Sequence, residues 1–211
     1  MLVRGLSPDR AIMQEKQMEY WLAESPWPGV ILWIILYISD YYLTIYSARG
    51  FRKIGHFQFE GSYELTPQFQ ADVDALKPLS TRHIVLLILF SIVIFVLWWV
   101  IADDLPWLYN LYLGLFLLVE IAVHLRHLRN VFLIYQVQRN GGVEGQISYR
   151  KWFSYRVSAF EFYLIGGLFL IVAILAFSSF FLGGALVCFA TGFKHGRLAE
   201  KTKAVAAAKQ P

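Results

Sequence analysis

The sequence predicts an all-α integral membrane helix bundle with five transmembrane helices, an external N-terminus and a cytoplasmic C-terminus. The chain of 211 residues is 57% hydrophobic and only 16% charged, and its mean hydropathy is +0.50. This composition leaves too little polar surface for a soluble domain, whereas a surface that faces lipid needs little. Long apolar runs and an uneven distribution of Lys and Arg are the two further observations.

Five apolar runs can cross a hydrocarbon core, which requires about 20 helical residues. They span residues 27–47, 83–102, 106–125, 159–177 and 180–193. The last run is short, but joining it to the fourth would give a helix far longer than a membrane is thick. We therefore expect a tight turn at Ser178 and Ser179. The whole chain, residues 1–211, is expected to form a single membrane domain.

The basic residues assign the two sides of the membrane, because cytoplasmic segments carry the excess of Lys and Arg. Sixteen of the 19 basic residues fall in residues 48–82, 126–158 and 194–211, and the connections after the second and fourth runs contain none. We therefore expect cytoplasmic loops at 48–82 and 126–158, a cytoplasmic tail at 194–211 and an outer segment at 1–26. A four-span arrangement would place the basic tail outside.

Two short helices are expected outside the spans. Ser7 followed by Pro8 is typical of a helix start, and it predicts a short N-terminal helix on the outer surface. Thr66 followed by Pro67 predicts a second helix in the first cytoplasmic loop, with an apolar face that includes Val73. We expect this second helix to cap the bundle from the inside.

The later spans carry their own boundary and packing signals. The third span is expected to continue beyond the membrane and to stop at residues 140–142, Asn-Gly-Gly, and Ser148 is expected to cap the helix that enters the fourth span. The pairs Gly166-Gly167 and Gly183-Gly184 form small-residue faces. Such faces permit close packing within the last hairpin or between protomers.

Three carboxylates lie inside the apolar runs, where an ionisable group is costly without a partner or a use. Asp40 shares a polar stripe with Thr44, and Glu120 shares one with His124 and His127, at helical spacing. Counted from the outer ends of their helices, Asp40 and Glu120 each lie roughly 20 Å deep. The sequence therefore predicts one polar pocket near the inner boundary. Its members are Asp40, Thr44, Glu120, His124 and Glu161, with His83, His127 and Glu64 at the rim.

This pocket has more than one chemical interpretation. Asp40, Glu120 and His124 are candidate ligands for a divalent metal, and the same groups serve in proton relays. In purely structural interpretations, His127 reaches toward water, His124 pairs with Glu120 along the helix, and Glu161 forms a salt bridge with an arginine. The sequence does not identify a cofactor. It contains no phosphate-binding loop or serine-nucleophile motif that would indicate a reaction.

The remaining composition limits the partners. The single cysteine, Cys188, excludes an intrachain disulfide and a thiolate metal cluster. The formal net charge of +4 comes from residues that border the apolar runs, so it does not indicate a nucleic-acid partner. The expected partners are the lipid bilayer and either further copies of the chain or a larger membrane complex.

One short pattern resembles a known group of proteins. The strings SDYYLTIYSARG and YELTP are similar to a pattern in small uncharacterised prokaryotic multi-pass membrane proteins, Asp-x3-Thr followed by Glu-x-Asn-Pro. Asp40, Thr44, Glu64 and Pro67 match this pattern, whereas Thr66 stands in place of Asn. The resemblance covers about thirty residues. It implies a prokaryotic cytoplasmic (inner) membrane and makes Asp40 and Glu64 a pair worth testing, but it implies no activity.

Three functional hypotheses follow. In the first, the pocket binds a cation, a proton or a small polar solute, for transport or for chemistry at the inner leaflet. In the second, the chain is a non-catalytic accessory or scaffold subunit, and its buried polar groups only lock the helices together. In the third, it is an intramembrane metal-dependent hydrolase, so enzymatic activity stays an open question.

Overall fold

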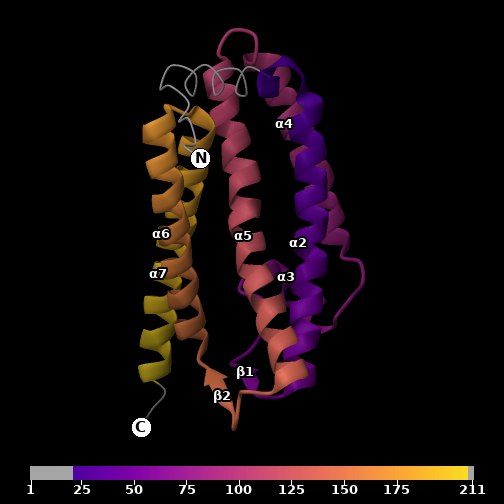
Figure 1. Ribbon diagram of the computed structural model, residues 1–211, viewed down its shortest axis with the longest axis vertical. Coiled ribbons are helices and arrows are strands. Elements are labelled where there is room, and N and C mark those ends of the chain that lie inside the picture. Colours follow the sequence, from indigo (N-terminus) through magenta and orange to yellow (C-terminus); the bar gives the residue numbers. More distant parts are fainter. Residues whose placement is uncertain (1–20, 209–211) are drawn as a thin grey trace, which may run out of the picture.

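The computed structural model describes residues 21–208, and it is an all-α bundle with one small sheet (Figure 1). The expected helix at Ser7 and Pro8 lies outside the described residues. The elements are α2 (Pro26–Ile54), β1 (Phe57–Phe59), α3 (Pro67–Asp74), α4 (Thr81–Ile101), α5 (Pro106–Asn140), β2 (Ile147–Tyr149), α6 (Lys151–Ala176) and α7 (Ser179–Ala207).

The five long helices run along the longest axis of the molecule (Figure 1). α5 stands in the middle, with α2 packed on one side and α7 on the other. α4 packs mainly on α2, and α6 forms an antiparallel hairpin with α7. α2 and the α6–α7 hairpin therefore face each other across α5.

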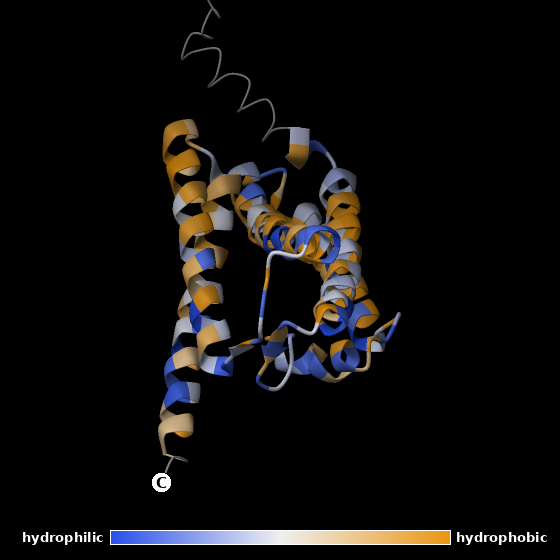
Figure 2. Cartoon of the chain, turned by 60° about the horizontal axis from the view of Figure 1, so that its bottom comes forward, coloured by the Kyte–Doolittle hydropathy of each residue, from blue (hydrophilic) through white to orange (hydrophobic). Residues whose placement is uncertain are grey.

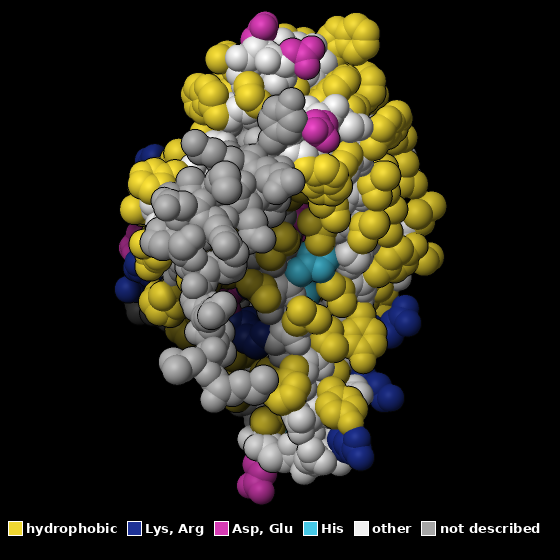
Figure 3. Space-filling model, turned by 45° about the horizontal axis from the view of Figure 1, so that its top comes forward, with side chains coloured by type: hydrophobic (Ala, Val, Ile, Leu, Met, Phe, Trp, Pro, Cys, Tyr) yellow, Lys and Arg dark blue, Asp and Glu magenta, His cyan; other side chains and the backbone are white. Residues whose placement is uncertain are grey.

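Four of these helices, α2, α4, α5 and α6, are long and apolar enough to cross a membrane. α7 is not among them, because its uncharged part ends at Phe193 and is shorter than the about 20 residues that a span requires. Large apolar side chains are exposed along the long helices, for example Ile88, Trp99 and Leu175. Figure 3 shows hydrophobic side chains over much of the coloured surface, with Lys and Arg along its left edge and in its lower half.

Local sequence signals explain where the helices begin and end. The Ser25 hydroxyl caps α2 by accepting a hydrogen bond from the Trp27 backbone N–H, and Gly55 ends this helix in the left-handed conformation. Pro106 starts α5, and Gly141, at φ 69°, ends it where the Asn-Gly-Gly stretch predicts. The Ser178 hydroxyl caps α7 by accepting from the Phe181 backbone N–H.

Two of the expected boundaries are wrong. Ser148 does not cap α6, because it lies in β2 and the helix begins after Arg150. The turn between α6 and α7 lies at Phe177 and Ser178 rather than at the two serines, since Phe177 adopts φ 52° and Ser179 already belongs to α7.

The end of the bundle where α2 and α5 stop is more ordered than the pair of loops that the sequence predicts. β1 and β2 form a two-stranded parallel sheet that ties the segment after α2 to the segment after α5. α3 begins after Thr66, as expected, and buries Val73 against Tyr41 and Ile45 of α2. Figure 2 shows that hydrophilic residues gather at this end, whereas hydrophobic residues follow the long helices.

Candidate functional site

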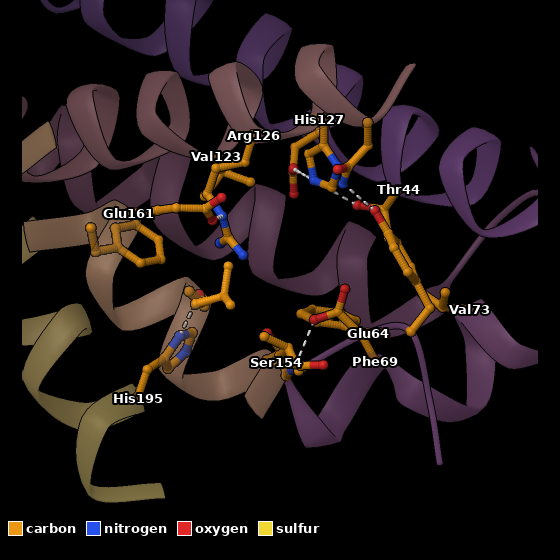
Figure 4. Close-up of a pocket in the computed structure, with 18 of the residues that line it drawn as sticks. Thr44, Glu64, Phe69, Val73, Val123, Arg126, His127, Ser154, Glu161 and His195 are labelled. Carbon is orange, nitrogen blue, oxygen red and sulfur yellow. Dashed lines mark hydrogen bonds and ion pairs between the residues drawn. The ribbon is translucent and has the colours of Figure 1, made fainter. Parts of the chain in front are cut away.

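A cavity of about 590 Å³ lies between α2, α5, α6 and α7, toward the end of the bundle that carries β1 and β2. The segment between β1 and α3 forms part of its wall. Side chains from separate elements converge on this space (Figure 4). The ionisable residues that line it, tyrosines aside, are Asp40, Glu64, His83, Glu120, Arg126, His127, Arg129, Glu161, Lys194 and His195.

Asp40 and His127 form a contact between α2 and α5. The Nε2 atom of His127 lies 3.0 Å from an Asp40 carboxylate oxygen and 3.0 Å from the hydroxyl of Thr44. Asp40 and Thr44 are four residues apart, so one turn of α2 presents both groups to the same imidazole. His127 is only 9% exposed. The interpretation that His127 reaches toward water is therefore wrong.

Glu120 lies two helical turns from His127 on the same face of α5. It is 8% exposed, and its Oε2 atom has no hydrogen-bond partner among the described residues. The Nδ1 atom of His127 and the Nε2 atom of His83 are likewise buried without a partner in this part of the chain. Because buried polar groups are normally satisfied, three such atoms on one cavity wall require an explanation.

Glu161 of α6 is held by two arginines of α5. Its carboxylate accepts a hydrogen bond from Arg126 Nε at 2.7 Å and also pairs with Arg129. The Arg126 guanidinium lies 5.1 Å from the centre of the Phe162 ring, a cation–π contact. The structural expectation of a salt bridge between Glu161 and an arginine is thus confirmed.

Glu64 reaches the cavity because the loop after β1 folds back toward the bundle. Its Oε1 atom accepts a hydrogen bond from the Thr66 backbone N–H at 2.6 Å. Burial raises the pKa of Glu64 above its ordinary value, and this hydrogen bond opposes the rise. Next to it, burial raises the pKa of Tyr63 to about 12, and the Tyr63 hydroxyl accepts a hydrogen bond from Asn130 at 2.7 Å.

An aromatic group lines the α2–α4 side of the cavity. The His83 ring stacks on Tyr37 with a centroid distance of 4.1 Å and lies 4.7 Å from the Tyr41 ring. Phe69 of α3 approaches His83 edge-on. His83 is packed among these three rings and is only 7% exposed.

The sequence predicts much of this wall but misses one side of it. Seven of the eight expected residues line the cavity, including all three rim residues. Arg126, Arg129, Lys194 and His195 also line it, and His195 Nδ1 lies 2.8 Å from the Ser158 hydroxyl. The sequence predicts a helical extension of the third span at Arg126 and Arg129 and a tail at Lys194 and His195, and it gives none of the four a place in the pocket. α7 continues as a helix through that tail, to Ala207. The run of helix formers after residue 193 was the available signal for α7.

His124 is the exception, and it also removes the expected metal ligand set. Its Nδ1 atom donates to the backbone carbonyl of Glu120 at 2.7 Å, and its Nε2 atom is engaged with Ser39 at 2.7 Å. It therefore does not join Asp40 and Glu120 as a third ligand. No group of three or more His, Cys, Asp or Glu side chains within residues 21–208 is arranged to hold a metal ion. His124 also pairs with the backbone of Glu120, and not with its carboxylate.

The three residues of the short resemblance that carry polar side chains, Asp40, Thr44 and Glu64, all line the cavity. They come from one turn of α2 and from the loop that folds back after β1. No family model, curated protein or solved structure matches the chain.

Proposed function

We propose that this chain is a multi-pass membrane protein that binds a small polar or charged solute in the cavity. The unsatisfied buried atoms carry this proposal. Glu120, His83 and His127 are each more than nine-tenths buried, and each presents a polar atom without a partner among the described residues. A bound solute would supply those partners, since leaving a buried polar group unpaired costs about 1–3 kcal/mol.

The size and composition of the cavity support the same proposal. Its volume of about 590 Å³ falls within the range of about 300–1,000 Å³ that is common for small-molecule sites. A helix-locking role, as in an accessory subunit, would need each polar group to be satisfied by its neighbour, as His124 is by Ser39. It would not need open space between the groups.

The proposed topology places the cavity near the inner leaflet of a prokaryotic cytoplasmic membrane. In this arrangement α7 is the fifth span, because it packs against both α5 and α6. The basic residues at the end of α2, Arg52 and Lys53, then lie on the cytoplasmic side together with those of the tail. We propose that the solute enters from that side.

The test is a thermal unfolding assay of the purified protein in lipid nanodiscs with a panel of probes. The panel contains Mg²⁺, Zn²⁺, ethanolamine, inorganic phosphate and glycine. A probe present at ten times its Kd should stabilise the wild type by about 1.4 kcal/mol. Glu120→Gln and Asp40→Asn should lose or weaken that response.

The matched control is Glu144→Gln, because Glu144 is an exposed carboxylate outside the cavity. It should respond to the probes as the wild type does. If no probe shifts the transition, and if Asp40→Asn and Glu120→Gln unfold as the wild type does, the proposal fails. The accessory-subunit hypothesis then remains.

A further inference from the structure

Acidic and basic side chains lie on different sides of the cavity, because α5 presents them on different faces. Successive helical residues are rotated by about 100°, so residues seven apart share a face and adjacent residues do not. Glu120 and His127 are seven residues apart and lie toward α2, where His127 meets Asp40. Arg126 and Arg129 lie on another face, toward α6, where both meet Glu161. The cavity therefore has an acidic side and a basic side.

The basic side keeps an excess of positive charge. Arg126 and Arg129 share the single carboxylate of Glu161, so the three groups together retain one positive charge. Lys194 of α7 also lines the cavity, and it forms no salt bridge with the described residues. Two guanidinium groups and an ammonium group around one space are suited to an anion with several oxygens, above all phosphate.

The acidic side has the opposite excess and an aromatic wall. Asp40 is paired with one imidazole, whereas Glu120 Oε2 is buried without a partner in the described part of the chain. Glu64 adds a third carboxylate from the folded-back loop. Next to these groups, Tyr37 and Tyr41 present their rings to the same cavity. The Tyr37 ring is already stacked on His83, so the carboxylates, which are strong partners of an ammonium group, carry the recognition.

We infer that the solute is zwitterionic, an organic ammonium that also carries a phosphate, with its ammonium toward Glu120 and Asp40 and its phosphate toward Arg126, Arg129 and Lys194. This inference rests on the proposed solute-binding function and names the class of solute. The same chemistry occurs in a free aminoalkyl phosphate and in the headgroup of an aminophospholipid of the inner leaflet.

The test compares a zwitterion with its two halves by titration calorimetry. The protein is reconstituted in nanodiscs of phosphatidylglycerol, which has no amine, and is titrated with phosphoethanolamine, ethanolamine and inorganic phosphate. Phosphoethanolamine should bind at least tenfold more tightly than either half. Lys194→Gln should weaken phosphoethanolamine and phosphate but leave ethanolamine unchanged, and Glu120→Gln should weaken phosphoethanolamine and ethanolamine but leave phosphate unchanged.

The matched controls are Lys201→Gln, which changes an exposed lysine of the same helix, and Glu144→Gln. Both variants should bind the probes as the wild type does.

Nanodiscs that contain phosphatidylethanolamine distinguish a lipid headgroup from a free solute. Competition by this lipid with soluble phosphoethanolamine supports the headgroup, and unchanged affinity supports the free solute. If ethanolamine or phosphate alone binds as tightly as phosphoethanolamine, the inference is overturned but solute binding stands. If none of the three binds while Mg²⁺, Zn²⁺ or glycine stabilises the protein, the inference alone is again overturned. If no probe binds to or stabilises the protein, both the inference and the proposed solute-binding function are overturned.

Discussion

Gly183→Ala is expected to force α5 and α7 apart. A Cβ atom at Gly183 would overlap the backbone carbonyl oxygen of Leu111, well inside the 3.0 Å below which real Cβ contacts are essentially absent. Gly114 of α5 faces the backbone carbonyl of Phe180 in the same way. Since both obstacles are backbone atoms, no side chain can rotate to relieve them, and the helices must separate.

The expected cost lies at the upper end of the range for overpacking, about 3 kcal/mol. For a chain of this size that corresponds to a melting temperature lower by roughly 6–12 °C. Gly167→Ala is the matched control, because no heavy atom lies within 4 Å of a Cβ built there. It should be neutral or should gain up to about 1 kcal/mol from helix propensity.

Thermal unfolding in detergent, followed by circular dichroism, compares the two variants with the wild type. Gly50→Ala supplies an intermediate case, because the nearest neighbours of its Cβ would be side-chain atoms of Ile134, at 2.8 Å. The order of stability should be Gly167→Ala, Gly50→Ala, Gly183→Ala. If Gly183→Ala is as stable as Gly167→Ala, then α7 does not pack on α5 as described. The account of how Lys194 reaches the cavity would then be wrong.

Two further predictions concern charges at the end of the bundle that carries β1 and β2. Glu161→Gln should destabilise the protein by about 3 kcal/mol, because it leaves two arginines of like charge without their carboxylate. Glu200→Gln, which breaks an exposed pair with Arg156, should cost about 0–1 kcal/mol; similar losses in urea unfolding would contradict the described clamp. Burial raises the pKa of Glu64, so the folded state holds this proton more tightly than the unfolded chain. The stability that protonated Glu64 contributes is fully present below the pKa of this group in the unfolded chain, and it is lost as pH rises through its pKa in the folded state. Glu64→Gln should therefore gain stability relative to the wild type as pH rises in melting curves. The pKa of Asp72 is lowered by a hydrogen bond from Lys77, so the advantage of the wild type over Asp72→Asn should instead disappear as pH falls; a parallel pH response in both variants would refute the two assignments.

The helices could be predicted because their signals are local. Ser25-Pro26, Pro106 and Gly141 each act within one turn of the helix end that they define. The strands could not be predicted in this way. β1 is stabilised by pairing with β2 about ninety residues further along the chain, and a three-residue strand carries no periodicity of its own.

The candidate site could be predicted in part for the same reason. Helical spacing places Glu120 and His127 on one face, and the cost of buried charge singles out Asp40 and Glu161. Spacing could not decide between His124 and His127, because they are less than one helical turn apart. The position of α2 decides, since it places Asp40 against His127 and Ser39 against His124. A count of charges in loops likewise cannot show that Arg126 turns inward.

Chemical labelling of a cysteine in the cavity wall tests the central proposal most directly. Ser154 lines the cavity (Figure 4), and the one native cysteine, Cys188, is buried, so Ser154→Cys can be studied in a Cys188→Ala background. Asp104→Cys, exposed at the other end of the bundle, is the control. A membrane-impermeant maleimide should modify Ser154→Cys only from the cytoplasmic side and Asp104→Cys only from the outer side. At least one of the probes named above should slow the reaction at Ser154→Cys alone. Labelling of both positions from one side, or a rate at Ser154→Cys that no probe changes, would contradict a solute site at the inner end of the bundle.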